Sequence, residues 1–98
     1  MAFEVFLTEK KDGEKLRQAL NDDIVSRQSI YLKDGKLYGQ KDGTEIAIVE
    51  GSDAGLAKAK TLITAFGKLA DAKEKETIYK AVKADEEASI EGMGAIFG

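Results

Sequence analysis

The sequence predicts an α+β domain in which a mainly antiparallel four-stranded sheet is covered on one face by helices. Three observations support this class. A run of alternating apolar residues opens the chain. Two Lys-Asp-Gly turn signals in the middle of the chain separate short runs rich in β-branched and aromatic residues. The last of these runs, 44–50, leads directly into the longest amphipathic segment. The predicted order of elements is β-α-β-β-β-α-α, in two layers.

The length and the composition fit one folded domain. A chain of 98 residues buries roughly 65% of its unfolded surface, which is enough for a single core. Hydrophobic residues make up 43% of the chain and charged residues 34%, which is typical of a globular protein and not of a disordered one. We expect residues 1–91 to form one domain and the glycine-rich apolar tail, 92–98, to be mobile or docked on a partner.

The first two elements are a strand and a short helix. Residues 2–8 alternate in character with a period of two, which predicts a strand. Asp12 can cap the helix that follows, because apolar residues then recur one turn apart. These residues are Leu16, Ala19, Leu20 and Ile24. The narrow apolar stripe indicates a helix that is stabilised by docking on the sheet.

Two turn signals, at 33–35 and 41–43, define the predicted middle of the sheet. Asp-Gly turns of this kind favour tight type I′ hairpins, in which both central residues have positive φ. Tight turns at both places imply a definite register, in which Leu32 faces Leu37 and Leu37 faces Ile48. The expected product is a three-stranded meander.

Alternation along this meander predicts one apolar face and one mixed face. The apolar face contains Ile30, Leu32, Leu37, Gly39, Ile46 and Ile48. The mixed face contains two tyrosines beside two lysines, and we expect it to stay open. Its candidate binding residues are Tyr31, Lys33, Lys36 and Tyr38.

The second half of the chain predicts two helices. Ser52 can cap a helix over about 54–70, whose apolar stripe would cover the sheet. Gly67 lies near the edge of that stripe, where the lack of a Cβ allows close contact with the sheet. Residues 71–74 have the spacing of a capping box and open a last helix over about 72–88. Its expected buried residues are Ile78, Tyr79 and Val82.

The absence of cysteine and histidine narrows the possible chemistry. The chain has no thiolate nucleophile, no disulfide and no imidazole base or metal ligand. We therefore expect no cofactor and no metal site, and a non-catalytic role is favoured over an enzymatic one. The first residues lack the basic and apolar regions of a secretory signal, and no run is long enough to span a membrane. A cytoplasmic location is expected.

The open Tyr31, Lys33, Lys36 and Tyr38 face suggests the leading function. We expect a binding or assembly module that contacts a protein partner, or a second copy of itself, through this face or through the tail. The alternative is a small RNA-binding domain, because aromatic side chains beside basic ones can stack on bases. A net charge of −3 disfavours nucleic acid as the partner.

A second alternative is an anion-binding or enzymatic domain at Gly51, Ser52 and Gly55. These residues follow a strand and open a helix, where free backbone N–H groups can bind an anion. The stretch lacks the Lys-Ser/Thr of a P-loop and the spacing of a dinucleotide-binding loop. An ordinary helix cap is the competing interpretation.

Overall fold

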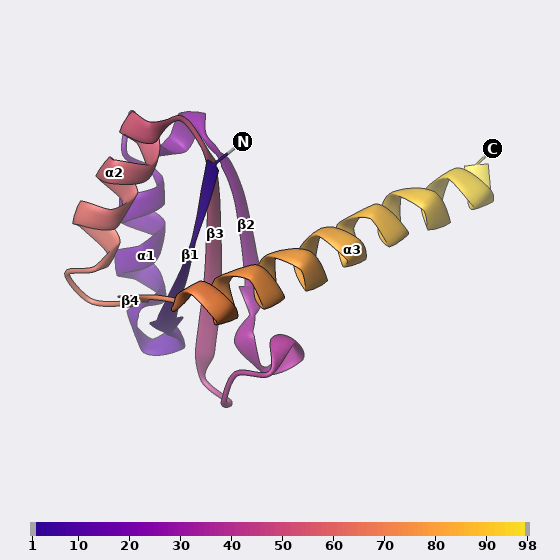
Figure 1. Cartoon of the computed structure of the whole chain (residues 1–98), viewed down its shortest axis with the longest axis horizontal. Coiled ribbons are helices and arrows are strands. Elements are labelled where there is room, and N and C mark those ends of the chain that lie inside the picture. The colour runs from indigo at the N-terminus through magenta and orange to yellow at the C-terminus, as the bar shows by residue number, and fades with distance from the viewer. Residues whose placement is uncertain (1, 98) are drawn as a thin grey trace.

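The computed structural model describes the backbone of residues 2–97 and the side chains of residues 2–88. The described chain contains four strands, three α-helices and three short 3-10 helices (Figure 1). The strands are Ala2–Glu9 (β1), Ser29–Asp34 (β2), Thr44–Gly51 (β3) and Lys68–Leu69 (β4). The α-helices are Gly13–Leu20 (α1), Asp53–Ile63 (α2) and Ala72–Phe97 (α3). The 3-10 helices are Lys10–Asp12 (η1), Val25–Arg27 (η2) and Gly35–Tyr38 (η3).

The strands form one antiparallel sheet in the order β2-β3-β1-β4. The α+β class and the four-stranded antiparallel sheet predicted from the sequence are confirmed. β1 and β3 are the two central strands and pair along their whole length, from Ala2 opposite Gly51 to Glu9 opposite Thr44. Up to β4 the element order is β-α-β-β-α-β, which is the split β-α-β topology.

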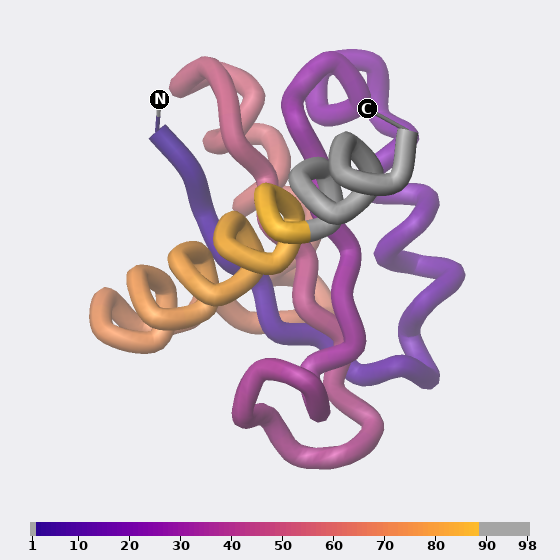
Figure 2. The backbone as a smooth tube through the Cα atoms, turned by 90° about the vertical axis from the view of Figure 1, so that its right-hand side faces the viewer, coloured from indigo at the N-terminus to yellow at the C-terminus, as the bar shows by residue number. Residues whose placement is uncertain are grey.

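Helices cover both faces of this sheet. In Figure 1, α1 and α2 lie on one side of the strands, and the described part of α3 crosses the other side in Figure 2. The first core, between the sheet and α1 and α2, is centred on Phe6. The second core brings Ile78 and Val82 of α3 against Val5 and Ile48 of the sheet. The predicted helical layer is therefore present, and α3 adds a layer on the face that was expected to stay open. That expectation of openness was wrong.

The pairing of β2 with β3 changes which residues share a face. Tyr31 lies opposite Ile48, and Leu32 lies opposite Ala47. Ile48 therefore points to the same side as Tyr31, whereas the predicted register placed it with Leu32. A slip of one residue moves every side chain of a strand to the other face. Both faces of β3 are buried, so its alternation carried too little information to choose between the two registers.

The predicted third strand does not form, because the segment after β2 turns into the 3-10 helix η3. The Asp34 side chain accepts a hydrogen bond from the Lys36 backbone N–H at 3.1 Å and so caps this helix. Gly35 is buried against Thr44, and a Cβ built on it would lie 2.8 Å from the Thr44 carbonyl oxygen. Gly39, with φ of 81°, ends η3. The first predicted hairpin was therefore wrong.

The second turn signal does form a turn, but not of the predicted type. The Thr44 N–H bonds to the Lys41 carbonyl at 3.3 Å. Gly43 has φ of 88°, while Asp42 keeps a negative φ, and a type I′ turn needs positive φ at both positions. The turn closes the irregular connection 35–43, and the fourth strand of the sheet is instead β4.

The helices follow the predicted patterns with different lengths. α2 ends at Ile63, before Gly67. Gly67 makes the expected close approach to the sheet from the following turn, where a Cβ would lie 2.6 Å from Thr8 Cγ2. The capping box of α3 is confirmed by reciprocal bonds between Asp71 and Glu74, at 2.8 and 3.3 Å.

The helix α3 extends to Phe97, beyond the predicted end at 88. The predicted apolar tail, 92–98, lies outside the residues whose side chains the structure describes. Within the described part of the chain, no helix is long and apolar enough to cross a membrane.

Candidate functional site

The four predicted binding residues lie on β2 and η3, at one edge of the sheet. Tyr31 and Lys33 point to the face crossed by α3, and Tyr38 packs at the border of the second core. Lys36 is exposed on η3 and does not lie opposite Lys33 in a hairpin, as the prediction required. The structure therefore brings three of the four residues together and separates Lys36 from them.

The partner of these three residues is α3. Lys83 donates a hydrogen bond to the Tyr31 hydroxyl at 3.1 Å and lies over the same ring, 5.1 Å from its centroid. Tyr38 donates its hydroxyl proton to Asp85 Oδ2 at 2.6 Å. Lys33 forms an ion pair with Glu86. The basic and aromatic residues thus meet carboxylates that belong to the chain itself.

These contacts change the acidity of the groups involved. The hydrogen bond to Asp85, together with partial burial and the negative charges of Asp85 and Glu86, raises the pKa of Tyr38 to about 12. The hydrogen bond to Tyr31 raises the pKa of Lys83, and together with the electrostatic effects of Tyr31 and Glu50 it outweighs the lowering by burial. The contacts of α3 with β2 and η3 that need these two protons therefore persist to higher pH than the ordinary pKa values would allow.

The other end of α3 is held at the N-terminal end of β1. Tyr79 stacks on Phe3 with ring centroids 3.8 Å apart and donates its hydroxyl proton to Glu50 at 2.6 Å. Glu4 accepts from Lys60 of α2 at 2.9 Å and from Lys75 of α3 at 3.2 Å. Glu4 therefore links the two helical layers around the edge of the sheet.

Two opposing effects determine the pKa of Glu4. Partial burial pushes the pKa of Glu4 upward, but the hydrogen bonds from Lys60 and Lys75 and their positive charges outweigh it. The net result is a pKa below the ordinary value. Glu4 is therefore ionised at neutral pH, and the link between the layers is intact there.

The outer edge of β2 is the part of this region that remains available. β2 pairs with β3 on one side and has no strand partner on its other side among residues 2–97. Large apolar side chains are exposed along it or beside it: Leu32 is 40% exposed, Leu37 on η3 is 75% exposed, and Ile24 before η2 is 44% exposed. The predicted meander placed a strand after Gly35 beside this segment, whereas the structure pairs β2 directly with β3.

The predicted anion site at the start of α2 is filled by Gln28. Gln28 Oε1 accepts from the Ser52 backbone N–H at 3.0 Å, at the place an anion would take. A Cβ on Gly51 or on Gly55 would lie 2.0 or 2.3 Å from atoms of the Gln28 side chain, so both glycines make room for it. Ser52 itself caps α2 by accepting from the Gly55 N–H at 3.1 Å. The cap interpretation explains these residues.

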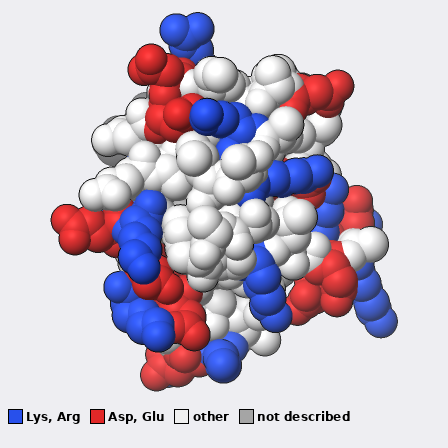
Figure 3. Space-filling view, turned by 90° about the vertical axis from the view of Figure 1, so that its left-hand side faces the viewer, with Lys and Arg blue, Asp and Glu red and all other residues white. Residues whose placement is uncertain are grey.

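The charge pattern offers little support for a nucleic acid or metal site. On the α1 and α2 side, basic and acidic side chains are interspersed around a central uncharged area, and no continuous basic surface is visible (Figure 3). RNA recognition by Tyr31 and Lys33 would require α3 to leave the sheet. Among the described side chains, no group of three carboxylates is placed to hold a metal ion.

Comparisons with known proteins do not add an assignment. The chain matches no protein-family model, no curated protein and no solved structure.

Proposed function

We propose that this chain is a non-catalytic assembly module that self-associates through the outer edge of β2. Two copies would place their β2 strands side by side and antiparallel, which extends the sheet from four strands to eight. The supporting observation is the outer edge of β2. This strand is six residues long, and no strand among residues 2–97 pairs with its outer side. An edge of this kind presents a row of N–H and C=O groups that another strand can pair with.

The edge carries little protection against pairing. Edge strands are usually guarded by proline, by free charges or by a bulge. β2 contains no proline, and its two charged residues already have partners within the chain. Lys33 pairs with Glu86, and Asp34 pairs with Lys10 at 3.0 Å. Neither charge is therefore free to repel a second strand.

The side chains of β2 suit a second copy. Ile30 and Leu32 point to the α1 and α2 side, and Tyr31 and Lys33 point to the α3 side. When both copies keep their helices on the same sides, residues that point to the same face meet across the new pair. In the registers that pair most of the strand, Leu32 lies opposite Ile30 or Leu32 of the second copy. Its exposed surface is thereby buried.

Light scattering on the purified chain tests the proposal. We expect the wild type to show twice the 10.6 kDa chain mass. Leu32→Lys places a charge in the new strand pair and should give the monomer mass with an unchanged circular dichroism spectrum. The matched control is Leu69→Lys, which adds the same charge at a residue that is 38% exposed on β4, at the opposite edge of the sheet, and should leave the dimer intact.

Two results would contradict the proposal. One is a wild type that stays at the monomer mass from micromolar to millimolar concentration. The other is a folded Leu32→Lys variant that stays dimeric. Hydrogen exchange of the wild type gives a check that needs no variant, because dimerisation should slow exchange of the outward N–H groups of β2 as concentration rises.

A further inference from the structure

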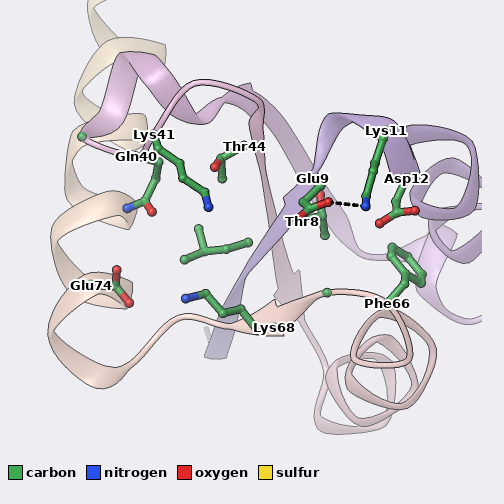
Figure 4. Close-up of a pocket in the computed structure, with 13 residues that line it drawn as sticks. Thr8, Glu9, Lys11, Asp12, Gln40, Lys41, Thr44, Phe66, Lys68 and Glu74 are labelled. Atoms are coloured by element: carbon green, nitrogen blue, oxygen red, sulfur yellow. Dashed lines mark ion pairs between the residues drawn. The ribbon is translucent and has the colours of Figure 1, made fainter.

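A hollow of about 820 Å³ lies at the end of the sheet where β1 ends and β3 begins. Its walls come from the end of β1, η1, the segment 39–41, the turn before β4 and the first turn of α3 (Figure 4). Loops that meet at one end of a sheet are a common place for small-molecule sites. The volume lies within the range of such sites, roughly 300–1,000 Å³.

The hollow has an apolar part. Leu7 and Phe66 line it, and each also packs against one of the two cores. The Thr8 hydroxyl, which is buried at the same place, donates to the Glu45 carbonyl at 3.2 Å and is not available to a ligand. Gly67 brings the chain close to β1 here, because a Cβ on it would lie 2.6 Å from Thr8 Cγ2.

Two lysines of the hollow, Lys41 and Lys68, lack an ion-pair partner among the described side chains. Lys41 and Lys68 approach from opposite walls, and both point their ammonium groups into the same central space (Figure 4). Because like charges held in one space repel each other, an anion between them would lower the electrostatic energy. The Gln40 side chain lies on the same wall and carries a further amide donor.

The three carboxylates of the hollow are already engaged. Glu9 pairs with Lys11 at 3.0 Å, as the dashed line in Figure 4 marks. Asp12 pairs with Lys15 at 3.7 Å. Glu74 accepts from the Asp71 backbone N–H as part of the α3 cap. Glu9 and Asp12 are thus neutralised by lysines of their own, whereas Glu74 keeps its negative charge and offsets one of the two positive charges of Lys41 and Lys68. One positive charge remains.

We propose that this hollow binds a small organic molecule that carries one oxyanion, a carboxylate or a phosphate, on an apolar body. Lys41 and Lys68 hold the oxyanion, and the body lies over Leu7 on the same face of β1. Phe66 packs against the core on the other face and lies across β1 from the two lysines (Figure 4). Charge-assisted hydrogen bonds fix the orientation of the ligand, and the apolar part adds the area that a free inorganic ion lacks. This site is separate from the β2 edge and does not depend on self-association.

Amide chemical shifts in NMR test the proposal with four probes: phenyl phosphate, benzoate, inorganic phosphate and phenol. We expect saturable shifts at Gly39, Thr44 and Gly67 with at least one of the two aromatic anions. Phenyl phosphate against benzoate distinguishes a phosphate ligand from a carboxylate ligand. Inorganic phosphate and phenol should bind roughly tenfold more weakly or not at all, because each lacks one half of the ligand.

The variant Lys41→Gln/Lys68→Gln should weaken the binding of the aromatic anion by roughly tenfold or more. The matched control is Lys36→Gln/Lys80→Gln, which removes the same charge from two exposed lysines that do not line the hollow. It should leave the affinity unchanged. The proposal is overturned if neither aromatic anion shifts these amides, if phenol binds as tightly as the anions, or if both double variants behave alike.

Discussion

The two faces of the sheet are held in different ways. The face under α1 and α2 is closed by a continuous apolar core, with Phe6, Leu16, Val25 and Ile63 fully buried. The face under α3 has a smaller apolar contribution from its helix, in which Ile78 and Val82 are buried. Beyond these two residues, α3 is held by directional contacts between tyrosines, lysines and carboxylates.

This difference predicts unequal stability. Apolar burial contributes in proportion to area and depends little on geometry, whereas partly exposed ion pairs contribute little and are weakened by salt. The α1 and α2 side therefore holds most of the folding free energy, and α3 should open at a lower cost than the whole domain.

The largest effect is expected from Phe6→Ala. Phe6 is completely buried in the first core, and its removal leaves a cavity that the two helices cannot close. We expect a loss of about 3–5 kcal/mol in the free energy of unfolding. Urea denaturation measures it. If Phe6→Ala lost less free energy of unfolding than Val82→Ala, the proposed ranking of the two faces would be reversed.

Val82→Ala should have an intermediate and local effect. Val82 is equally buried, but it lies under α3. The expected loss is on the order of 1–2 kcal/mol. Hydrogen exchange locates it: the amides of α3 should exchange faster, while those of β1 and β3 stay protected. Uniform loss of protection in all elements would show that α3 and the sheet open together.

Tyr38→Phe should have the smallest effect, below about 1 kcal/mol at neutral pH. It also has a pH signature. The pKa of Tyr38 is raised from 10.0 to about 12, so the folded state binds its proton more tightly. The contribution is fully present below pH 10 and is lost as the pH rises towards 12. Ultraviolet absorbance of the phenolate, compared between wild type and Tyr38→Phe, tests this, and ionisation of Tyr38 near pH 10 would contradict it.

The sequence correctly predicted an element where the local pattern allowed one interpretation. Period two predicted β1 and β3, and the spacing from Asp71 to Glu74 predicted the cap of α3. It was insufficient at Asp34 and Gly35. An aspartate before glycine suits both a tight hairpin and the cap of a 3-10 helix, and the choice depends on the distant contact of Gly35 with Thr44.

The candidate site was predicted in part. Tyr31 and Lys33 were correctly placed on one face, because neighbours two apart in a strand point the same way. Their cover was not foreseen. Asp85 and Glu86 of α3 supply part of this cover, through their contacts with η3 and β2. The spacing of residues along the sequence does not indicate a contact between residues that are 47 positions apart, such as Tyr38 and Asp85.

The central position of β1 has a consequence for the order of folding. Val5 pairs with Ile48, about forty residues further along the chain, and contacts of such high sequence separation slow folding. During synthesis β1 therefore cannot pair until β3 has left the ribosome, although it has apolar side chains on both faces. The hairpin-like pair of β2 and β3 is more local and can form first, as a template onto which β1 is added. The helix α3 is made last and closes a sheet that is already assembled.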